Sequence, residues 1–379
     1  MVREKSKTKV RAAVMLSGVA ATVITTAVFY MKPIAVLSTA LVAPTAAREA
    51  LTDYMSGEIP HEDNSENGEA AENPSVQAPT QANEEAAANE QEAVEEKPAA
   101  ADVQTAEEAV PPENRYPIEE FKFASSSTAD NYFLYGAGCV RNATYFSNDE
   151  MLSAARGSLG FELEFGSQEP QILIMHTHTT ESFERFDAGF YDVSYPTRST
   201  KPEENIIAVG KVLCESLNAA GICAVQADEY HDYPQYDNSY SRSAETVKEY
   251  LEMYPSIKMV LDIHRDGMER EDKTRVKPTI EINGRKAAQI MIICGADDGS
   301  MGLPNFRENL KLAARLQNAS ETLYPGFARP LYLAYRHYNQ NLTTGSLLVE
   351  VGSEASTMEE AKYSAEILAE IIAAYFKNT

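Results

Sequence analysis

The feature that most constrains the fold is an alternation of short apolar runs with amphipathic stretches between residues 171 and 376. Apolar runs of about four to eight residues are typical of buried strands, and apolar side chains repeating every three or four residues are typical of helices. Strands are predicted at 171–175, 222–227, 257–263, 279–282, 288–294, 331–335 and 346–352, and helices at 205–220, 243–254, 305–323 and 357–376. Asn283-Gly284 predicts a hairpin turn between the strands beside it. The alternation predicts an α/β domain with a mainly parallel sheet flanked by helices on both faces.

Histidine and carboxylate side chains stand at the ends of three of these strands. His178 follows the first strand, His264 follows the third, and Glu350 lies inside the last. Ligands of open α/β sheets bind beyond the carboxyl ends of the strands, so we expect these side chains to lie together. A lone histidine at a strand end is more often a structural group. Three of the chain's six histidines stand at two such ends, however, which favours a metal site.

Zinc is the metal that this combination favours. Catalytic zinc sites use three imidazole or carboxylate ligands and keep one position for water. His178 and Glu181 are three residues apart, so one turn of chain can direct both to one ion, and His264 supplies the third ligand. Glu350 lies among Leu and Val side chains, where an unpaired carboxylate is costly, and is the candidate general base.

Neighbouring polar residues leave alternatives open. His176 could replace His178 as a ligand or support the site from behind, and Arg265 and Asp266 could hold substrate or orient His264. His231 and His337 are weaker candidates. The Tyr-rich stretch 230–240 is interpreted either as a substrate lip or as a surface loop.

The first 31 residues predict a membrane anchor. Residues 1–11 hold five basic side chains, and residues 12–31 hold no charge, enough for a helix to cross the ~30 Å hydrocarbon core. The basic flank predicts a cytoplasmic amino end, and therefore a single-pass cell-membrane protein whose body is extracytoplasmic. Residues 32–55 are interpreted as an interfacial segment. The alternative is a cleaved signal peptide with its cut site near residues 46–47, which also leaves the body outside.

Residues 56–115 predict a disordered acidic linker before a catalytic domain at 116–379. Residues 56–114 hold sixteen acidic side chains and one basic side chain, and too few large apolar side chains to form a core. The chain's net charge is −24 and its basic residues form no cluster beyond the first dozen, which argues against nucleic acid as a partner. The four cysteines include no CxxC pair, which excludes a structural zinc ribbon, and a disulfide between Cys214 and Cys223 stays open.

Several blocks of the predicted domain resemble the stage II sporulation protein P family, membrane-anchored cell-wall hydrolases of endospore-forming bacteria. These blocks are 172–182 (ILIMHTHTTES), 195–200 (YPTRST), 232–243 (DYPQYDNSYSRS), 261–266 (LDIHRD), 282–290 (INGRKAAQI), 305–317 (NFRENLKLAARLQ) and 347–353 (LLVEVGS). The resemblance implies a fold similar to that of zinc-dependent N-acetylmuramoyl-L-alanine amidases. It also implies cleavage of the lactyl–alanine amide of peptidoglycan, with peptide-crosslink cleavage as a second activity. Stage II sporulation proteins D and M are the implied partners during engulfment.

The same resemblance implies roles for individual residues. His178 and His264 match the two histidines of the amidase site, and Glu350 matches the catalytic glutamate. General amidases take the third ligand from near the start of the following helix, which here indicates Glu203 or Glu204, whereas the spacing to His178 favours Glu181. The chain lacks the usual Asp-Pro-Gly-His lead-in, so the assignment around residues 176–181 stays open. Two other functions also stay open: a zinc carboxypeptidase-like enzyme acting on stem peptides, and a non-catalytic wall-binding scaffold.

Overall fold

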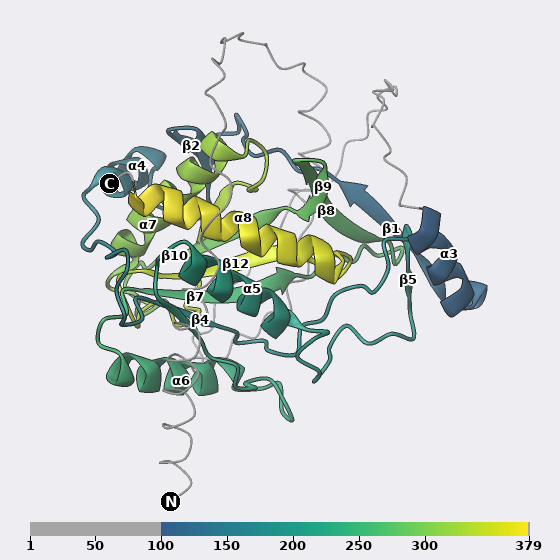
Figure 1. Cartoon of the computed structure of the whole chain (residues 1–379). Helices are drawn as coiled ribbons and strands as arrows, with labels where there is room; N and C mark the ends of the chain where they lie inside the picture. Colours follow the sequence, from purple (N-terminus) through teal and green to yellow (C-terminus); the bar gives the residue numbers. More distant parts are fainter. Residues whose placement is uncertain (1–99, 378–379) are drawn as a thin grey trace, which may run out of the picture.

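The computed structural model describes residues 100–377, and its larger sheet has eight strands in the order β2-β3-β11-β10-β12-β7-β4-β6 (Figure 1). These strands are β2 (Tyr132–Tyr135), β3 (Gly138–Asn142), β4 (Ile172–Met175), β6 (Ala224–Gln226), β7 (Met259–Asp266), β10 (Ile290–Gly295), β11 (Leu331–Ala334) and β12 (Ser346–Ser353). Strands β12, β7, β4 and β6 are mutually parallel, and so are β3, β11 and β10. The two groups meet in antiparallel pairing at β10–β12, and β2 runs antiparallel to β3 at the edge. The expected mixed α/β fold with a mainly parallel sheet is therefore confirmed, with one reversal inside the sheet.

Helices cover the two faces of this sheet unequally. The helices are α4 (Asn148–Arg156), α5 (Ile206–Ala219), α6 (Ser239–Met253), α7 (Phe306–Leu323) and α8 (Met358–Lys377). Figure 1 shows α5, α7 and α8 on one side of the sheet and α6 on the other. Successive strand residues point to opposite faces, so Leu261 joins the core under α5 and α8 whereas Val260 packs under α6. Asp262 and His264 of β7 point to the same face as Val260, which is the face on which α6 lies.

A second sheet has the order β5-β1-β8-β9. Its strands are β1 (Arg115–Phe121), β5 (Phe190–Asp192), β8 (Arg275–Ile282) and β9 (Arg285–Ala288). The β8–β9 hairpin turns at Asn283 and Gly284, whose φ values of 53° and 74° are typical of a type I′ turn, so the predicted hairpin is confirmed. The predicted strand at 288–294 is wrong in extent: β9 ends at Ala288, and β10 is a separate strand of the larger sheet. The side chain of Gln289 fixes this transition by accepting from Phe123 N at 2.7 Å and donating to Phe123 O at 2.9 Å.

Lys277 of β8 is a buried cation where the smaller sheet meets α8. Its Nζ lies 2.6 Å from Asp187 Oδ1, 2.7 Å from Glu120 Oε1 and 3.0 Å from Glu360 Oε1. Burial disfavours the charged ammonium, but these carboxylates outweigh burial and raise the pKa of Lys277. Glu360 also completes a capping box at the start of α8, because its Oε2 accepts from Thr357 N at 2.7 Å. The three carboxylates converge as metal ligands would, but the lysine ammonium already pairs with all of them.

The predictions for the amino-terminal part mostly lie outside the described residues. These are the cytoplasmic tail 1–11, the membrane helix 12–31, the interfacial segment 32–55 and the linker up to residue 99. The end of the predicted disordered linker is instead regular: α3 (Ala100–Ala109) and the turn η1 (Pro112–Asn114) precede β1, with Ala106 and Val110 buried. Between residues 100 and 377, none of the helices combines the length and apolar composition that crossing a membrane requires. The four cysteines are free thiols.

We expect Lys277→Met to lower the free energy of unfolding by about 3–5 kcal/mol, because it leaves the buried Glu360 carboxylate without its cation. Urea unfolding at pH 7 measures this change. Adding Glu360→Gln to Lys277→Met should recover part of the loss, because the unpaired charge is then removed. A double variant that is as unstable as the sum of the two single variants would contradict the pairing.

Candidate functional site

The parallel register of β12, β7 and β4 brings the candidate residues to one edge of the larger sheet. Glu350 of β12 is paired with His264 of β7, so their side chains stand on the same face. On the other side of β7, Met175 at the end of β4 is paired with Asp262, and the chain then continues into His176. The predicted meeting of three strand ends is therefore what the structure shows.

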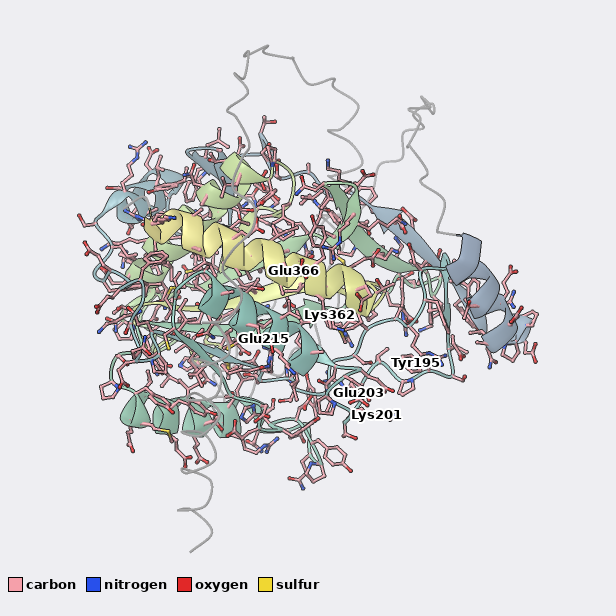
Figure 2. All side chains as sticks on the ribbon, in the orientation of Figure 1. Tyr195, Lys201, Glu203, Glu215, Lys362 and Glu366 are labelled. Atoms are coloured by element: carbon pink, nitrogen blue, oxygen red, sulfur yellow. The ribbon has the colours of Figure 1, made fainter. Side chains whose placement is uncertain are left out.

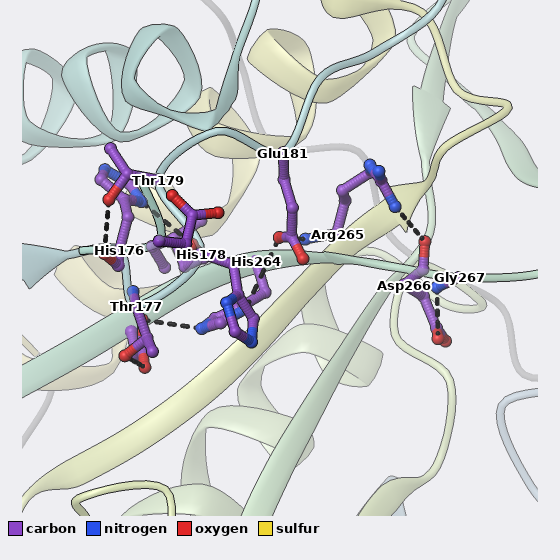
Figure 3. Close-up of polar contacts among 12 residues, drawn as sticks. His176, Thr177, His178, Thr179, Glu181, His264, Arg265, Asp266 and Gly267 are labelled. Carbon is purple, nitrogen blue, oxygen red and sulfur yellow. Dashed lines mark hydrogen bonds and ion pairs between the residues drawn. The ribbon is translucent and has the colours of Figure 1, made fainter. Parts of the chain in front are cut away.

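His178, Glu181 and His264 form a buried group at this edge (Figure 3). The rings of His178 and His264 are perpendicular, with centroids 5.2 Å apart. His264 Nδ1 lies 3.5 Å from Glu181 Oε2, which also accepts from the backbone N–H of Arg265 at 3.1 Å. Burial alone would raise the pKa of Glu181, but His264, Arg265 and His178 outweigh it and hold that pKa far below its usual range. Glu181 is thus an ionised carboxylate between two imidazoles.

Three atoms of the site are buried with no hydrogen-bond partner among residues 100–377: His178 Nδ1, His264 Nε2 and Glu350 Oε2. A buried polar atom without a partner costs about 1–3 kcal/mol. Burial lowers the pKa of His178 to about 4, so its ring is neutral near pH 7 and Nδ1 can present a lone pair. Imidazole nitrogens and carboxylate oxygens are the donors that zinc accepts. The residues therefore fit a zinc ion.

Asp262 supports His264 and was missed in the sequence analysis. Its Oδ1 lies 2.8 Å from His264 Nε2, although the ring N–H direction does not meet the oxygen as a hydrogen bond. Asp262 is itself held by Thr177, whose N–H donates to Oδ1 at 2.9 Å and whose hydroxyl donates to Oδ2 at 2.7 Å. Burial would lower the pKa of His264, but Asp262 and Glu181 raise it well above its ordinary value, so zinc binding at this ring would release its proton. The available signal was spacing, because Asp262 stands two residues before His264 and shares its strand face.

Tyr236 covers one side of His178. The two rings stack at 4.8 Å and 9°, and the Tyr236 hydroxyl lies 3.1 Å from His178 Nε2. The guanidinium of Arg198 lies 4.6 Å from the centre of the Tyr236 ring and pairs with Asp232 at 2.8 Å. Part of the Tyr-rich stretch thus lies against the site, and His178 Nδ1 is the ring nitrogen left without a bond.

Glu350 is a buried acid in the middle of β12. Burial raises its pKa to about 8, with Asp266 and Glu181 adding to the rise and His264 and Arg329 opposing it. A carboxyl group with such a pKa can exchange a proton near neutral pH, as a general acid–base residue must. Asp266 itself pairs with Arg329, whose Nη1 lies 2.9 Å from Asp266 Oδ2.

Arg265 holds the loop beside the site. Its Nε donates to Ser182 O and its Nη2 donates to Thr197 O, both at 2.8 Å. These bonds fix the segment that carries Glu181. The guanidinium of Arg265 thus binds backbone carbonyls. The prediction was instead that Arg265 holds substrate or orients His264.

His176 is engaged on both ring nitrogens away from this group. Nδ1 lies 2.9 Å from Ile263 O, and Nε2 lies 2.9 Å from Gln226 Nε2. A Cβ at Gly210 of α5 would lie 2.4 Å from His176 Nε2, so glycine permits this close approach. The geometry therefore favours His178 over His176 as the ligand candidate.

The remaining candidates lie in other contacts. Glu204 accepts from Ser199 and Lys201, both at 2.8 Å, and Glu203 is exposed at the surface beside Lys201 (Figure 2). These contacts favour Glu181 over Glu203 and Glu204 as the carboxylate of the group. The rings of His231 and His337 are engaged by other groups: His231 lies 2.6 Å from His176 O and 2.9 Å from Thr246, and His337 Nδ1 accepts from Asn339 N.

We expect Asp262→Asn to weaken zinc affinity about 10–100-fold, because an amide supports the His264 ring less well than a carboxylate. Competition with a chromogenic chelator at pH 7 measures the affinity. Asp228→Asn, a change at an exposed position after β6, is the matched control. Equal zinc affinity in the two variants would rule out the support that we assign to Asp262.

Comparison with known proteins identifies the family. The family model for stage II sporulation protein P (SpoIIP) matches residues 32–373. Stage II sporulation protein P of Bacillus subtilis (strain 168) is 28% identical over 211 residues, which are 53% of this chain and 49% of that protein. The chain thus matches about half the length of this curated relative.

Three amidases are among the solved structures to which this chain is similar in part. The first is N-acetylmuramoyl-L-alanine amidase AmiC2 of Nostoc punctiforme, with 14% identity, coverage of 55% of this chain and 96% of that chain, and a TM-score of 0.29. The second is the CwlD amidase from Clostridioides difficile in complex with the GerS lipoprotein, with 14% identity, coverage of 55% of this chain and 97% of that chain, and a TM-score of 0.31. The third is N-acetylmuramoyl-L-alanine amidase from Clostridium difficile 630, with 14% identity, coverage of 56% of this chain and 99% of that chain, and a TM-score of 0.32. The assignment rests on the sequence match and not on these structural likenesses. Because the family model matches most of its length, this chain belongs to the stage II sporulation protein P family.

Proposed function

We propose that this chain is a zinc-dependent N-acetylmuramoyl-L-alanine amidase, which cuts the amide between the glycan and the stem peptide of peptidoglycan. The observation that carries the proposal is the convergence of His178, Glu181 and His264 beside a buried, raised-pKa Glu350. Membership of the sporulation family and the amidase names of the solved neighbours agree with it.

His178, Glu181 and His264 would hold the zinc ion, which when bound polarises a carbonyl and lowers the pKa of water to ~7. Glu350 takes the proton of the attacking water as the C–O bond forms at the lactyl carbonyl. It then gives a proton to the alanine nitrogen as the C–N bond breaks, so a carboxylate and a free amine result. Asp262 holds the ring of His264 in place, and Glu181 stays ionised through its neighbours.

We also propose where this reaction takes place. The uncharged stretch 12–31 would anchor the chain in the cell membrane as a single span, with the catalytic domain extracytoplasmic. The sporulation family favours septal wall remodelling and engulfment as the setting, stage II sporulation proteins D and M as partners, and peptide-crosslink cleavage as an added activity. The composition of residues 1–31 and the family match support this placement.

The test is digestion of purified sacculi by the full-length chain. The wild-type chain should release intact stem peptides with a new amino-terminal alanine, and chelation should stop the release until zinc is restored. Glu350→Gln should release them about 10²–10⁴-fold more slowly, because the proton carrier is lost. Glu215→Gln, the same change at an exposed position of α5, is the control (Figure 2).

The products separate the amidase from its rivals. Loss of single terminal residues from the peptides would indicate a carboxypeptidase. Intact sacculi and a chain without stoichiometric zinc would indicate a wall-binding scaffold. Undiminished release by Glu350→Gln would refute the role of Glu350.

A further inference from the structure

Tyr240, in the first turn of α6, borders the candidate site at His178. Its ring meets the His178 ring edge-on, with the ring centroids 5.6 Å apart. The centroid of the Tyr338 ring lies 5.5 Å from that of Tyr240. It is half-buried, so one side of the residue still meets solvent. This aromatic pair is therefore a partly exposed border of the buried site.

The backbone that carries Tyr338 is held in an unusual conformation. Tyr338 and Asn339 have φ values of 42° and 53°, which bulky non-glycine residues rarely adopt. The residue that follows this turn is held in place: the side chain of Gln340 accepts from Gly295 N at 2.8 Å and donates to Ile293 O at 3.0 Å. Strained backbone that its surroundings enforce is common at functional sites.

Asn339 ties this turn to Tyr240. Its Nδ2 donates to Tyr240 O at 2.8 Å and to Ser243 Oγ at 3.0 Å. Ser243 Oγ lies 2.8 Å from Thr177 Oγ1, which donates to Asp262. A continuous set of hydrogen bonds thus connects the tyrosine pair to the residue that supports His264, and fixes the distance between them.

Of Tyr236, Tyr240 and Tyr338, Tyr240 is the one whose hydroxyl forms no hydrogen bond among residues 100–377. The Tyr236 hydroxyl is engaged by His178, and Arg336 engages that of Tyr338. The Tyr240 ring lies against the His178 ring, so its phenol, which is a hydrogen-bond donor, borders the same buried group.

We propose that the Tyr240 hydroxyl donates a hydrogen bond to the carbonyl oxygen of the scissile amide, and that Tyr338 and Asn339 are positioning residues for it. The proposal rests on the amidase function proposed above. The carbonyl oxygen gains negative charge as water attacks, so a fixed donor stabilises the transition state more than the bound substrate. Removal of such a donor should therefore change kcat and leave KM nearly constant.

The test is steady-state kinetics of the full-length chain on a purified glycan–peptide fragment of peptidoglycan. We expect Tyr240→Phe to lower kcat about 10²-fold, the usual effect of losing one such donor. KM, zinc content and the thermal unfolding temperature should stay at the wild-type values. Tyr145→Phe, at a residue that is 92% exposed, removes a hydroxyl elsewhere and is the matched control.

Asn339→Ala separates positioning from general support of the fold. We expect Asn339→Ala to lower kcat. We also expect a smaller effect of adding Tyr240→Phe, because a hydroxyl that is already misplaced contributes little to the rate. Additive effects of the two changes would refute the role of Asn339. The proposal for Tyr240 would be overturned if kcat of the Tyr240→Phe chain stayed within about threefold of wild type. It would also be overturned if the loss of activity came from a raised KM or a lowered zinc content.

The same assay keeps this inference apart from the function on which it rests. If the wild-type chain cleaves no amide, the proposed amidase function is wrong and the role of Tyr240 falls with it. If the wild-type chain is active and Tyr240→Phe is equally active, only the role of Tyr240 is wrong.

Discussion

The parallel pairing of β4, β7 and β12 is the constraint on which the site depends. In a strand, a shift of register by one residue moves every side chain to the opposite face. The observed register places Glu350 of β12 beside His264 of β7. It also pairs Asp262 of β7 with Met175, the last residue of β4, after which the chain continues to His178 and Glu181. The apolar cores on the two faces of these strands hold that register in place.

Buried carboxylates occur in two different settings in this molecule. Around Lys277 the carboxylates of Glu120, Asp187 and Glu360 are all paired, and this cluster joins the smaller sheet to α8. At the candidate site, by contrast, Glu350 Oε2, His178 Nδ1 and His264 Nε2 form no hydrogen bond within residues 100–377, although His264 Nε2 lies beside Asp262. Of these two acidic clusters, only the second has buried polar atoms without a hydrogen bond in the described part of the chain.

Local patterns in the sequence were sufficient for most of the larger sheet and its helices. Strands β4, β6, β7, β11 and β12 and helices α5, α7 and α8 are confirmed, because each contains a short, largely apolar run or a clear helical stripe. Helix α6 begins four residues earlier than expected, at Ser239, because Asn238 in a left-handed conformation precedes it. The antiparallel β10–β12 pair was not foreseen, since strand order depends on contacts far apart in the chain.

Less regular parts could not be predicted from local pattern. Strand β1 has the sequence RYPIEEF, whose acidic side chains pair with Arg270, Lys277 and Lys286 from other parts of the chain, so nothing local marks it as a strand. Helix α3 lies in an acidic stretch and is held by Arg115, which donates to Glu107 O at 2.7 Å. At the site, the strand-end histidines and acids were visible in the sequence, whereas Asp262 and Tyr240 gain their roles from neighbours on other elements.

X-ray absorption at the zinc edge of the zinc-loaded full-length chain tests the central claim most directly. The account predicts one zinc per chain, two imidazole nitrogens and oxygen ligands at about 2.0–2.2 Å, and no sulfur near 2.3 Å. His178→Ala should remove one imidazole from that shell, whereas His176→Ala should leave both. A sulfur ligand, fewer than two imidazoles in the wild-type chain, or no stoichiometric zinc would contradict the account.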